Sequence, residues 1–166
     1  VARAWSVFRA FPLDPPIFRM TPSIGITNLP SRLHLAAPRT FTHAETLPDG
    51  RRLEVQASVS AVLVQWSDGS PGTAHAVTAA IGNPGSVRHT FFLKSCPPNY
   101  QSSHLDGPKC HPNLEEYPIT VTLRWSARYR AGTPWTSLGT IDRPASIRYD
   151  VDEVLGVLRR DASDAP

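Results

Sequence analysis

The sequence has no run of about 20 apolar residues, the length that an α-helix needs to cross a bilayer. We therefore expect no membrane-spanning helix among the 166 residues. Contact with a membrane would come only through an upstream anchor or through a partner. The chain begins at Val1 rather than at Met, so we interpret it as a processed protein or as a segment cut from a longer one. Any export signal would then lie upstream.

Charge is also scarce, since only 19% of the residues are charged and the net charge is +3. The arginines are scattered, and the only local concentrations are the pair Arg51 and Arg52 and the pair Arg159 and Arg160. A surface that binds nucleic acid usually has a denser basic patch with aromatic residues between the charges. The sequence therefore predicts that nucleic acid is not a partner.

Patterns typical of catalytic and metal sites are missing as well. The chain contains no G-x-S-x-G motif, which marks the nucleophile of many hydrolases. Glu115 and Glu116 are adjacent, so in a strand they would point to opposite faces and could not act as an acid–base pair. The turn sequences at 47–50 and 68–72 lack the spacing of a calcium-binding loop. We expect no enzymatic activity, no metal and no cofactor.

The chain has only two cysteines, Cys96 and Cys110, within a stretch at 94–113 that is rich in turn-forming residues. An even number of cysteines in such a chain favours a disulfide and an oxidising compartment. Zinc held by both cysteines with His104 and His111 is an alternative, and a reduced pair is another. The cysteines lack the close C-x₂₋₄-C spacing of zinc sites. The sequence thus predicts a disulfide-closed loop in an exported protein, at the cell surface, outside the cell or in the periplasm.

Proline and glycine are abundant, with 17 and 10 residues, which indicates many turns and few long helices. Alternating apolar and polar residues at 53–59 and 119–125 predict strands with one buried face. Further strands are expected at 33–35, 61–66, 75–80, 86–92 and 145–151. The segment 152–160 also fits a helical stripe, but its glycine and β-branched valines favour a strand. This pattern is typical of an all-β fold, an immunoglobulin-like antiparallel β-sandwich. The loop at 94–113 would be an insertion between two of its strands.

The segment before the predicted sandwich differs from the rest of the chain. Residues 1–30 carry Trp5, Phe8 and Phe11 at a helix-like spacing, followed by a proline-rich stretch. We expect an extended arm that packs on the domain or serves as a docking segment for a partner. The domain itself is predicted to span residues 31–160, and residues 161–166 are expected to form a frayed tail.

Three motifs occur in an order that is characteristic of one family. They are VQWSDGS at 64–70, VRHTF at 87–91 and YPITVTLRWSARY at 117–129. In this order they resemble divergent PKD-like domains, the polycystic-kidney-disease type of immunoglobulin-like β-sandwich on bacterial surface proteins. The segments at 26–35 and 148–160 resemble the flanks of such domains in exported actinobacterial proteins. The usual WDFGDG turn is shortened here to WSDGS, and the loop before YPITV is unusually long.

The resemblance implies an antiparallel sandwich that binds or spaces rather than catalyses. Trp66 ends a strand, so its ring can fill the end of the core. Asp68 and Gly69 supply a chain reversal. His89 is expected to hydrogen-bond that turn, in a structural role.

The predicted function is a non-catalytic structural or adhesion module of a cell-surface or envelope assembly, with a protein partner or a second copy of the chain. The N-terminal arm and the loop at 94–113 would make the contacts. One alternative is a carbohydrate- or cell-wall-binding module with an exposed aromatic pair, and another is an accessory subunit of a larger membrane complex held by residues 1–30. The candidate binding residues are Trp5, Phe8, Phe11, Tyr100 and Trp135.

Overall fold

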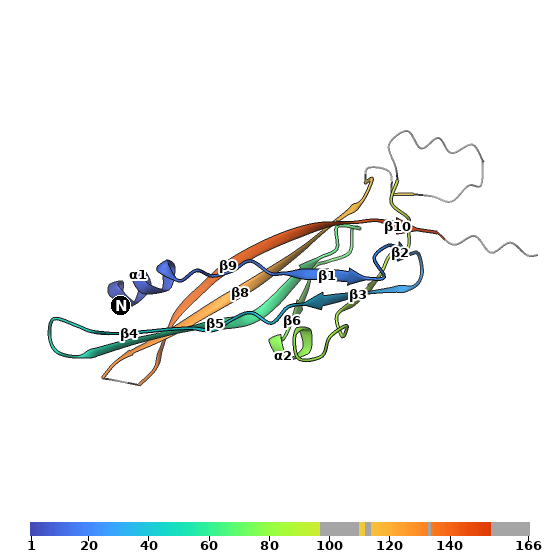
Figure 1. Ribbon diagram of the computed structural model, residues 1–166. Coiled ribbons are helices and arrows are strands. Elements are labelled where there is room, and N and C mark those ends of the chain that lie inside the picture. Colours follow the sequence, from blue (N-terminus) through green and yellow to red (C-terminus); the bar gives the residue numbers. More distant parts are fainter. Residues whose placement is uncertain (97–109, 112–113, 133, 154–166) are drawn as a thin grey trace, which may run out of the picture.

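The computed structural model describes residues 1–96, 110–111, 114–132 and 134–153. Antiparallel strands dominate it and form a curled sandwich in an elongated molecule (Figure 1). The strands of this part are β1 (Phe18–Thr21), β2 (Gly25–Ile26), β3 (Pro30–Leu35), β4 (Phe41–Thr46), β5 (Arg52–Gln65), β6 (Thr73–His75), β7 (Arg88–Thr90), β8 (Tyr117–Ala131), β9 (Thr136–Tyr149) and β10 (Val151–Asp152). The helices are α1 (Ala2–Ala10) and α2 (Val77–Ala80). Neither helix has the length and apolar character that a bilayer crossing requires.

The main sheet has the order β4–β5–β8–β9, with β6 paired to the far end of β5. Strand β8 lies inside it, and every second side chain is buried along most of its length, namely Tyr117, Ile119, Val121, Leu123, Trp125 and Ala127. The intervening residues face the other side of the sheet and include Thr122, Arg124 and Arg128. This alternation confirms the strand predicted at 119–125 and gives the sheet one apolar face and one polar face.

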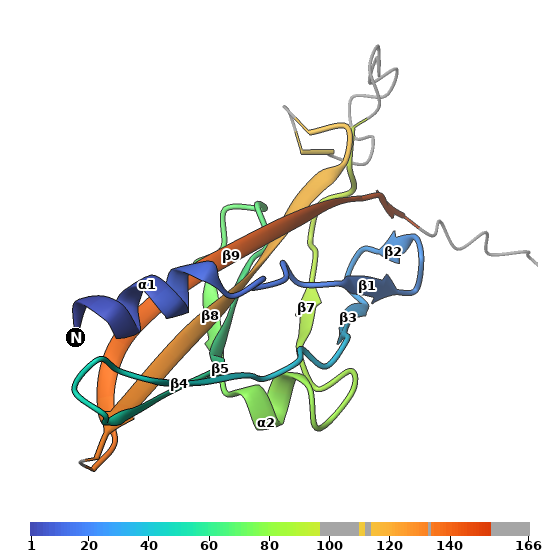
Figure 2. The same cartoon turned by 60° about the vertical axis from the view of Figure 1, so that its left-hand side comes forward.

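Two layers cover the apolar face of the main sheet (Figure 2). Helix α1 lies over one end, and the three-stranded sheet β1–β3–β7 lies towards the other. Phe91, just after β7, contacts the rings of both Tyr117 and Tyr149. The Tyr149 hydroxyl bonds to Ser31 of β3, at 2.9 Å. The sandwich predicted from the sequence is therefore present, with a helix replacing the second sheet over one end.

Strand β5 contains one extra residue relative to β8, while the same face of the sheet stays towards the core. Ser60 has no opposite residue in β8, because Val59 pairs with Trp125 and Ala61 pairs with Arg124. This β-bulge reverses the alternation, so odd-numbered residues are buried before it and even-numbered residues after it, namely Leu53, Val55 and Ala57, then Val62, Val64 and Trp66. The two strands expected at 53–59 and 61–66 are one continuous strand.

The N-terminal segment is a helix rather than the extended arm that we expected. The apolar side of α1, formed by Ala4, Val7 and Phe8, is buried on the main sheet. Residues later in the segment belong to the fold as β1 and β2, which pair with β3 and β10. Residues 1–30 thus pack on the domain, and whether they also dock a partner stays a prediction. The strand expected at 75–80 is also shorter, since β6 ends at His75 and α2 follows.

Candidate functional site

The two cysteines form the predicted disulfide, with 5.0 Å between the Cα atoms of Cys96 and Cys110. Backbone hydrogen bonds hold both ends, from Cys96 to the carbonyl of Leu114 and from His111 to the carbonyl of Lys94. Sulfur atoms joined in a disulfide are not thiolates, so this pair cannot supply the zinc ligands of the alternative reading. Tyr100 and His104 lie outside the described residues.

The turn after β5 is fixed by Asp68. Its carboxylate accepts hydrogen bonds from the backbone and hydroxyl of Ser70 and, at 2.5 Å, from Nε2 of His89. Burial alone would raise the pKa of Asp68, but the hydrogen bonds from Ser70 and His89 outweigh it and hold that pKa below its ordinary value. The expected contact between His89 and the turn is confirmed. It joins the end of β5 to β7, so Asp68 and His89 serve the architecture.

The aromatic residues of the N-terminal segment face the chain itself. Phe8 is fully buried, so it is not the partner contact that we expected. Phe11 stacks on Phe41 with 5.6 Å between the ring centroids. Trp5 lies against Gly139, where a Cβ atom would come within 3.2 Å of the indole. These three rings attach α1 to the main sheet.

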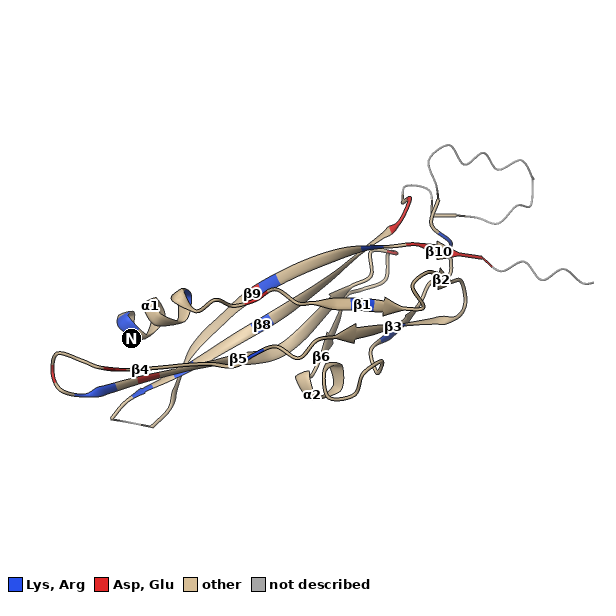
Figure 3. Cartoon of the chain, viewed as in Figure 1, with Lys and Arg blue, Asp and Glu red and all other residues tan. Residues whose placement is uncertain are grey.

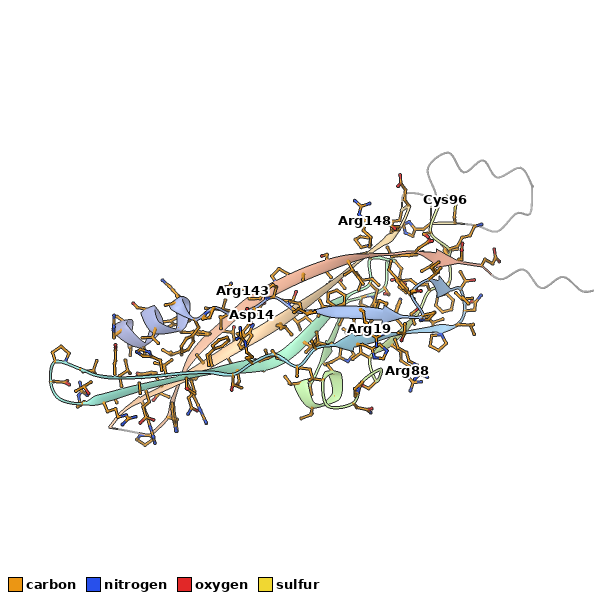
Figure 4. All side chains as sticks on the ribbon, viewed as in Figure 1. Asp14, Arg19, Arg88, Cys96, Arg143 and Arg148 are labelled. Atoms are coloured by element: carbon orange, nitrogen blue, oxygen red, sulfur yellow. A yellow bond between two sulfur atoms is a disulfide. The ribbon has the colours of Figure 1, made fainter. Side chains whose placement is uncertain are left out.

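Large apolar side chains are exposed at the end of the molecule where the disulfide lies. They are Ile24 at 49% exposure, Leu29 at 54%, Phe92 at 74% and Leu93 at 37%, and we call this group the apolar end. Figure 4 shows Cys96 at the end of the molecule where Figure 1 shows β2 and β10. Phe92 was not predicted as a binding residue. The signal for it was the pair Phe91 and Phe92 next to a strand, because adjacent side chains of an extended segment point to opposite sides.

The backbone beneath the apolar end is well anchored. Asn28 donates to the carbonyl of Phe91, at 2.9 Å, and Ser95 donates to the carbonyl of Val151, at 2.9 Å. The buried hydroxyl of Tyr117 donates to the carbonyl of Leu93, at 2.7 Å, and burial raises the pKa of this tyrosine to about 12. The exposed Phe92 and Leu93 side chains therefore project from backbone with a defined position.

The polar face of the main sheet carries a second candidate site. The register places Thr42, Gln56, Arg128 and Ser137 side by side in one row across β4, β5, β8 and β9. The next row contains Ser58 and Ser126. These six side chains line a groove of about 680 Å³, which we call the polar groove.

Trp135 lies beside the polar groove and is half-buried. The guanidinium groups of Arg128 and Arg130 lie 4.7 and 4.8 Å from the centroid of its ring. Arg130 also pairs with Glu54 at 2.7 Å, and Arg128 donates to the side-chain oxygen of Gln56 at 2.9 and 3.2 Å. The structure thus brings Trp135 together with arginines rather than with a second aromatic ring.

Trp135 was predicted as a binding residue from the sequence, whereas the polar groove was not. The polar side chains of β5 and β8 could be assigned to one face by alternation, yet their alignment depends on the register between strands. That register is a tertiary property, and the bulge at Ser60 shifts it. Comparisons with family models, with curated proteins and with solved structures gave no match.

Proposed function

We propose that this chain is an exported, non-catalytic interaction module of a cell-surface or envelope assembly, and that it binds a partner protein through the apolar end. The observation that carries the proposal is Phe92, which is 74% exposed on an anchored backbone. An accessory subunit of a larger membrane complex is one setting for such a module.

Exposed apolar side chains on a fixed backbone, such as Phe92 and Leu93, favour binding to another protein. Binding through Phe92 and Leu93 removes apolar surface from water, a gain of roughly 25 cal/mol per Å² before association costs. Because the hydrogen bonds to Phe91 and Leu93 already fix the backbone, little further chain entropy is lost. Aromatic side chains that become buried when two proteins bind supply much of the binding energy of protein interfaces.

The charges near the apolar end argue for a protein rather than a lipid surface. Glu115, Asp152 and Glu153 are exposed. Glu116 lies 3.9 Å from the exposed Arg148, which offsets one of these charges. Figure 3 shows acidic residues at the start of β8 and in β10. Anionic lipid headgroups would repel these carboxylates. A protein surface with an apolar centre and a basic rim would match both the side chains and the charges.

Two observations support the remaining parts of the proposal. The Cys96–Cys110 disulfide fits an oxidising compartment and hence an exported protein. The PKD-like assignment is supported by the sandwich and by the stacked Trp66 and His89 next to the Asp68 turn. The three motif segments thus meet in one structural unit.

The test is site-specific photo-crosslinking in the native cell envelope. A photoreactive residue at position 92 should give one discrete adduct that Leu93→Ser weakens, whereas the same residue at position 17 should give none. Ile17 is a matched control, because it has the same 74% exposure and lies just before β1. An adduct with another protein, or with a second copy, would support the module. Adducts with lipid alone, or equal labelling at both positions, would refute it.

A further inference from the structure

We propose that the polar groove is a binding site for an acidic saccharide, a glycan whose sugars carry carboxylate groups. The site lies on the open face of the main sheet and is independent of the protein contact at the apolar end. The proposal rests on three features of the groove, namely an uncompensated positive charge, a set of unused hydroxyl groups and an aromatic ring that holds the charge in place.

The charge belongs to Arg128. Its Nε and Nη2 atoms donate to the neutral side-chain oxygen of Gln56. The acid of the neighbouring row, Glu54, is paired with Arg130 at 2.7 Å and with Arg52 at 3.3 Å. Within the described ranges no carboxylate pairs with Arg128, so its positive charge remains available to a ligand. An arginine with a free Nη1 edge is well suited to a planar carboxylate.

The hydroxyl groups are those of Thr42, Ser58, Ser126 and Ser137. In the part of the chain that the structure describes, none of the four hydrogen-bonds to another protein group. Each hydroxyl can donate and accept, which is what sugar hydroxyls require. Because all four lie on paired strands, their positions are set by the sheet before a ligand arrives.

Trp135 acts here as a positioning residue. Guanidinium groups within about 6 Å of an indole centroid are attracted to the ring, and both Arg128 and Arg130 meet this condition. The indole thus limits the side-chain motion of Arg128, and Gln56 fixes its other side. The groove is prepared for an anion without the aromatic pair that a neutral-sugar platform would need.

Other anionic ligands fit less well. A nucleic acid would require a denser basic surface than one unpaired arginine provides. An acidic peptide usually adds a strand to a sheet edge, whereas the groove crosses the inner strands β5 and β8, whose backbone groups already pair with their neighbours. A carboxylated sugar uses both the charge and the row of hydroxyls.

The experiment is calorimetric titration of the intact chain with uronic-acid oligosaccharides, using oligogalacturonate, oligoalginate and hyaluronan fragments as probes. A neutral malto-oligosaccharide of equal length and free glucuronate are the comparison ligands. We expect at least one acidic oligomer to bind about tenfold or more tightly than either comparison ligand. Failure of all three acidic oligomers to bind, or equal binding of the neutral oligomer, would overturn the proposal.

Matched variants test the site itself. Arg128→Gln should weaken binding about tenfold, and Ser126→Ala should weaken it severalfold without any change in net charge. Arg19→Gln, on β1, removes the same charge from an exposed arginine elsewhere and should leave binding unchanged (Figure 4). Equal losses in Arg128→Gln and Arg19→Gln would show that only net charge matters and would refute the groove. Thermal unfolding of each variant confirms that it is folded.

Discussion

The imidazole of His89 lies flat on the indole of Trp66, with 4.6 Å between the ring centroids and 7° between the planes. Trp66 follows β5 in the main sheet and His89 lies in β7 of the second sheet, so the stack joins the two layers. The same imidazole also donates a hydrogen bond to the carboxylate of Asp68. One carboxylate thereby fixes the turn, the histidine and the contact between sheets.

Asp68→Asn should lower the free energy of unfolding at pH 7 by about 1 to 2 kcal/mol, because it removes a charge-assisted hydrogen bond. The pKa of Asp68 in the folded protein lies below the ordinary value of 3.8. Its stabilising effect is therefore complete above about pH 4 and is lost as the pH falls through the folded pKa. Urea unfolding at pH 7 and at pH 3 should show the wild type losing more stability on acidification than the variant. Asp142→Asn is the control, since its pair with Arg124 is exposed and should contribute little.

Replacing both cysteines by serine should lower the free energy of unfolding by about 3 kcal/mol, the value expected for a closed loop of about 15 residues. Reductant should lower the unfolding midpoint of the wild type and leave that of the Cys96→Ser/Cys110→Ser variant unchanged. Intact mass should rise by about 2 Da on reduction, as two thiols form. Free thiols in protein isolated without reductant would contradict the disulfide and remove the main support for export.

Phe8 and Phe92 are the same residue type in opposite environments, and their alanine variants should differ accordingly. Phe8→Ala should lower the free energy of unfolding by about 3 to 5 kcal/mol, because it leaves a cavity between α1 and the main sheet. Phe92→Ala should change it by less than about 0.5 kcal/mol. Chemical denaturation of both variants gives the comparison. A Phe8→Ala protein as stable as the wild type would mean that α1 does not pack on the sheet in solution.

The local alternation of apolar and polar residues correctly predicted the strands whose burial follows the same alternation in the folded protein. The alternation at 119–125 predicts a strand with one face buried against an apolar layer. In β8 every second residue of this stretch is buried. The spacing of Trp5, Phe8 and Phe11 already had a helical period, but the prolines after it favoured an extended arm. The helix is stabilised because its apolar side packs on the end of the main sheet that the second sheet leaves uncovered. The sequence alone does not indicate that this surface exists.

The candidate sites depended on contacts between distant segments. Arg128 and Gln56 are 72 positions apart, and only the strand register places them side by side. The bulge at Ser60 is similarly hidden, because 53–59 has the alternation of one strand and 61–66 has the apolar character of a separate one. Phe92 is exposed because the neighbouring Phe91 points into the core, where its ring contacts Tyr117 and Tyr149. These contacts join distant segments of the chain.

The long strands of the main sheet run along the long axis of the molecule, from the end near α1 to the apolar end (Figure 1). Strand β8 alone extends about 45 Å at the usual rise per residue. A pull applied between the two ends would act parallel to the strands and load the hydrogen bonds between β5 and β8 together, in shear. Bonds loaded in this way share the force, whereas a pull across the strands would open them one at a time. The architecture is thus mechanically suited to carrying tension along the long axis of the molecule.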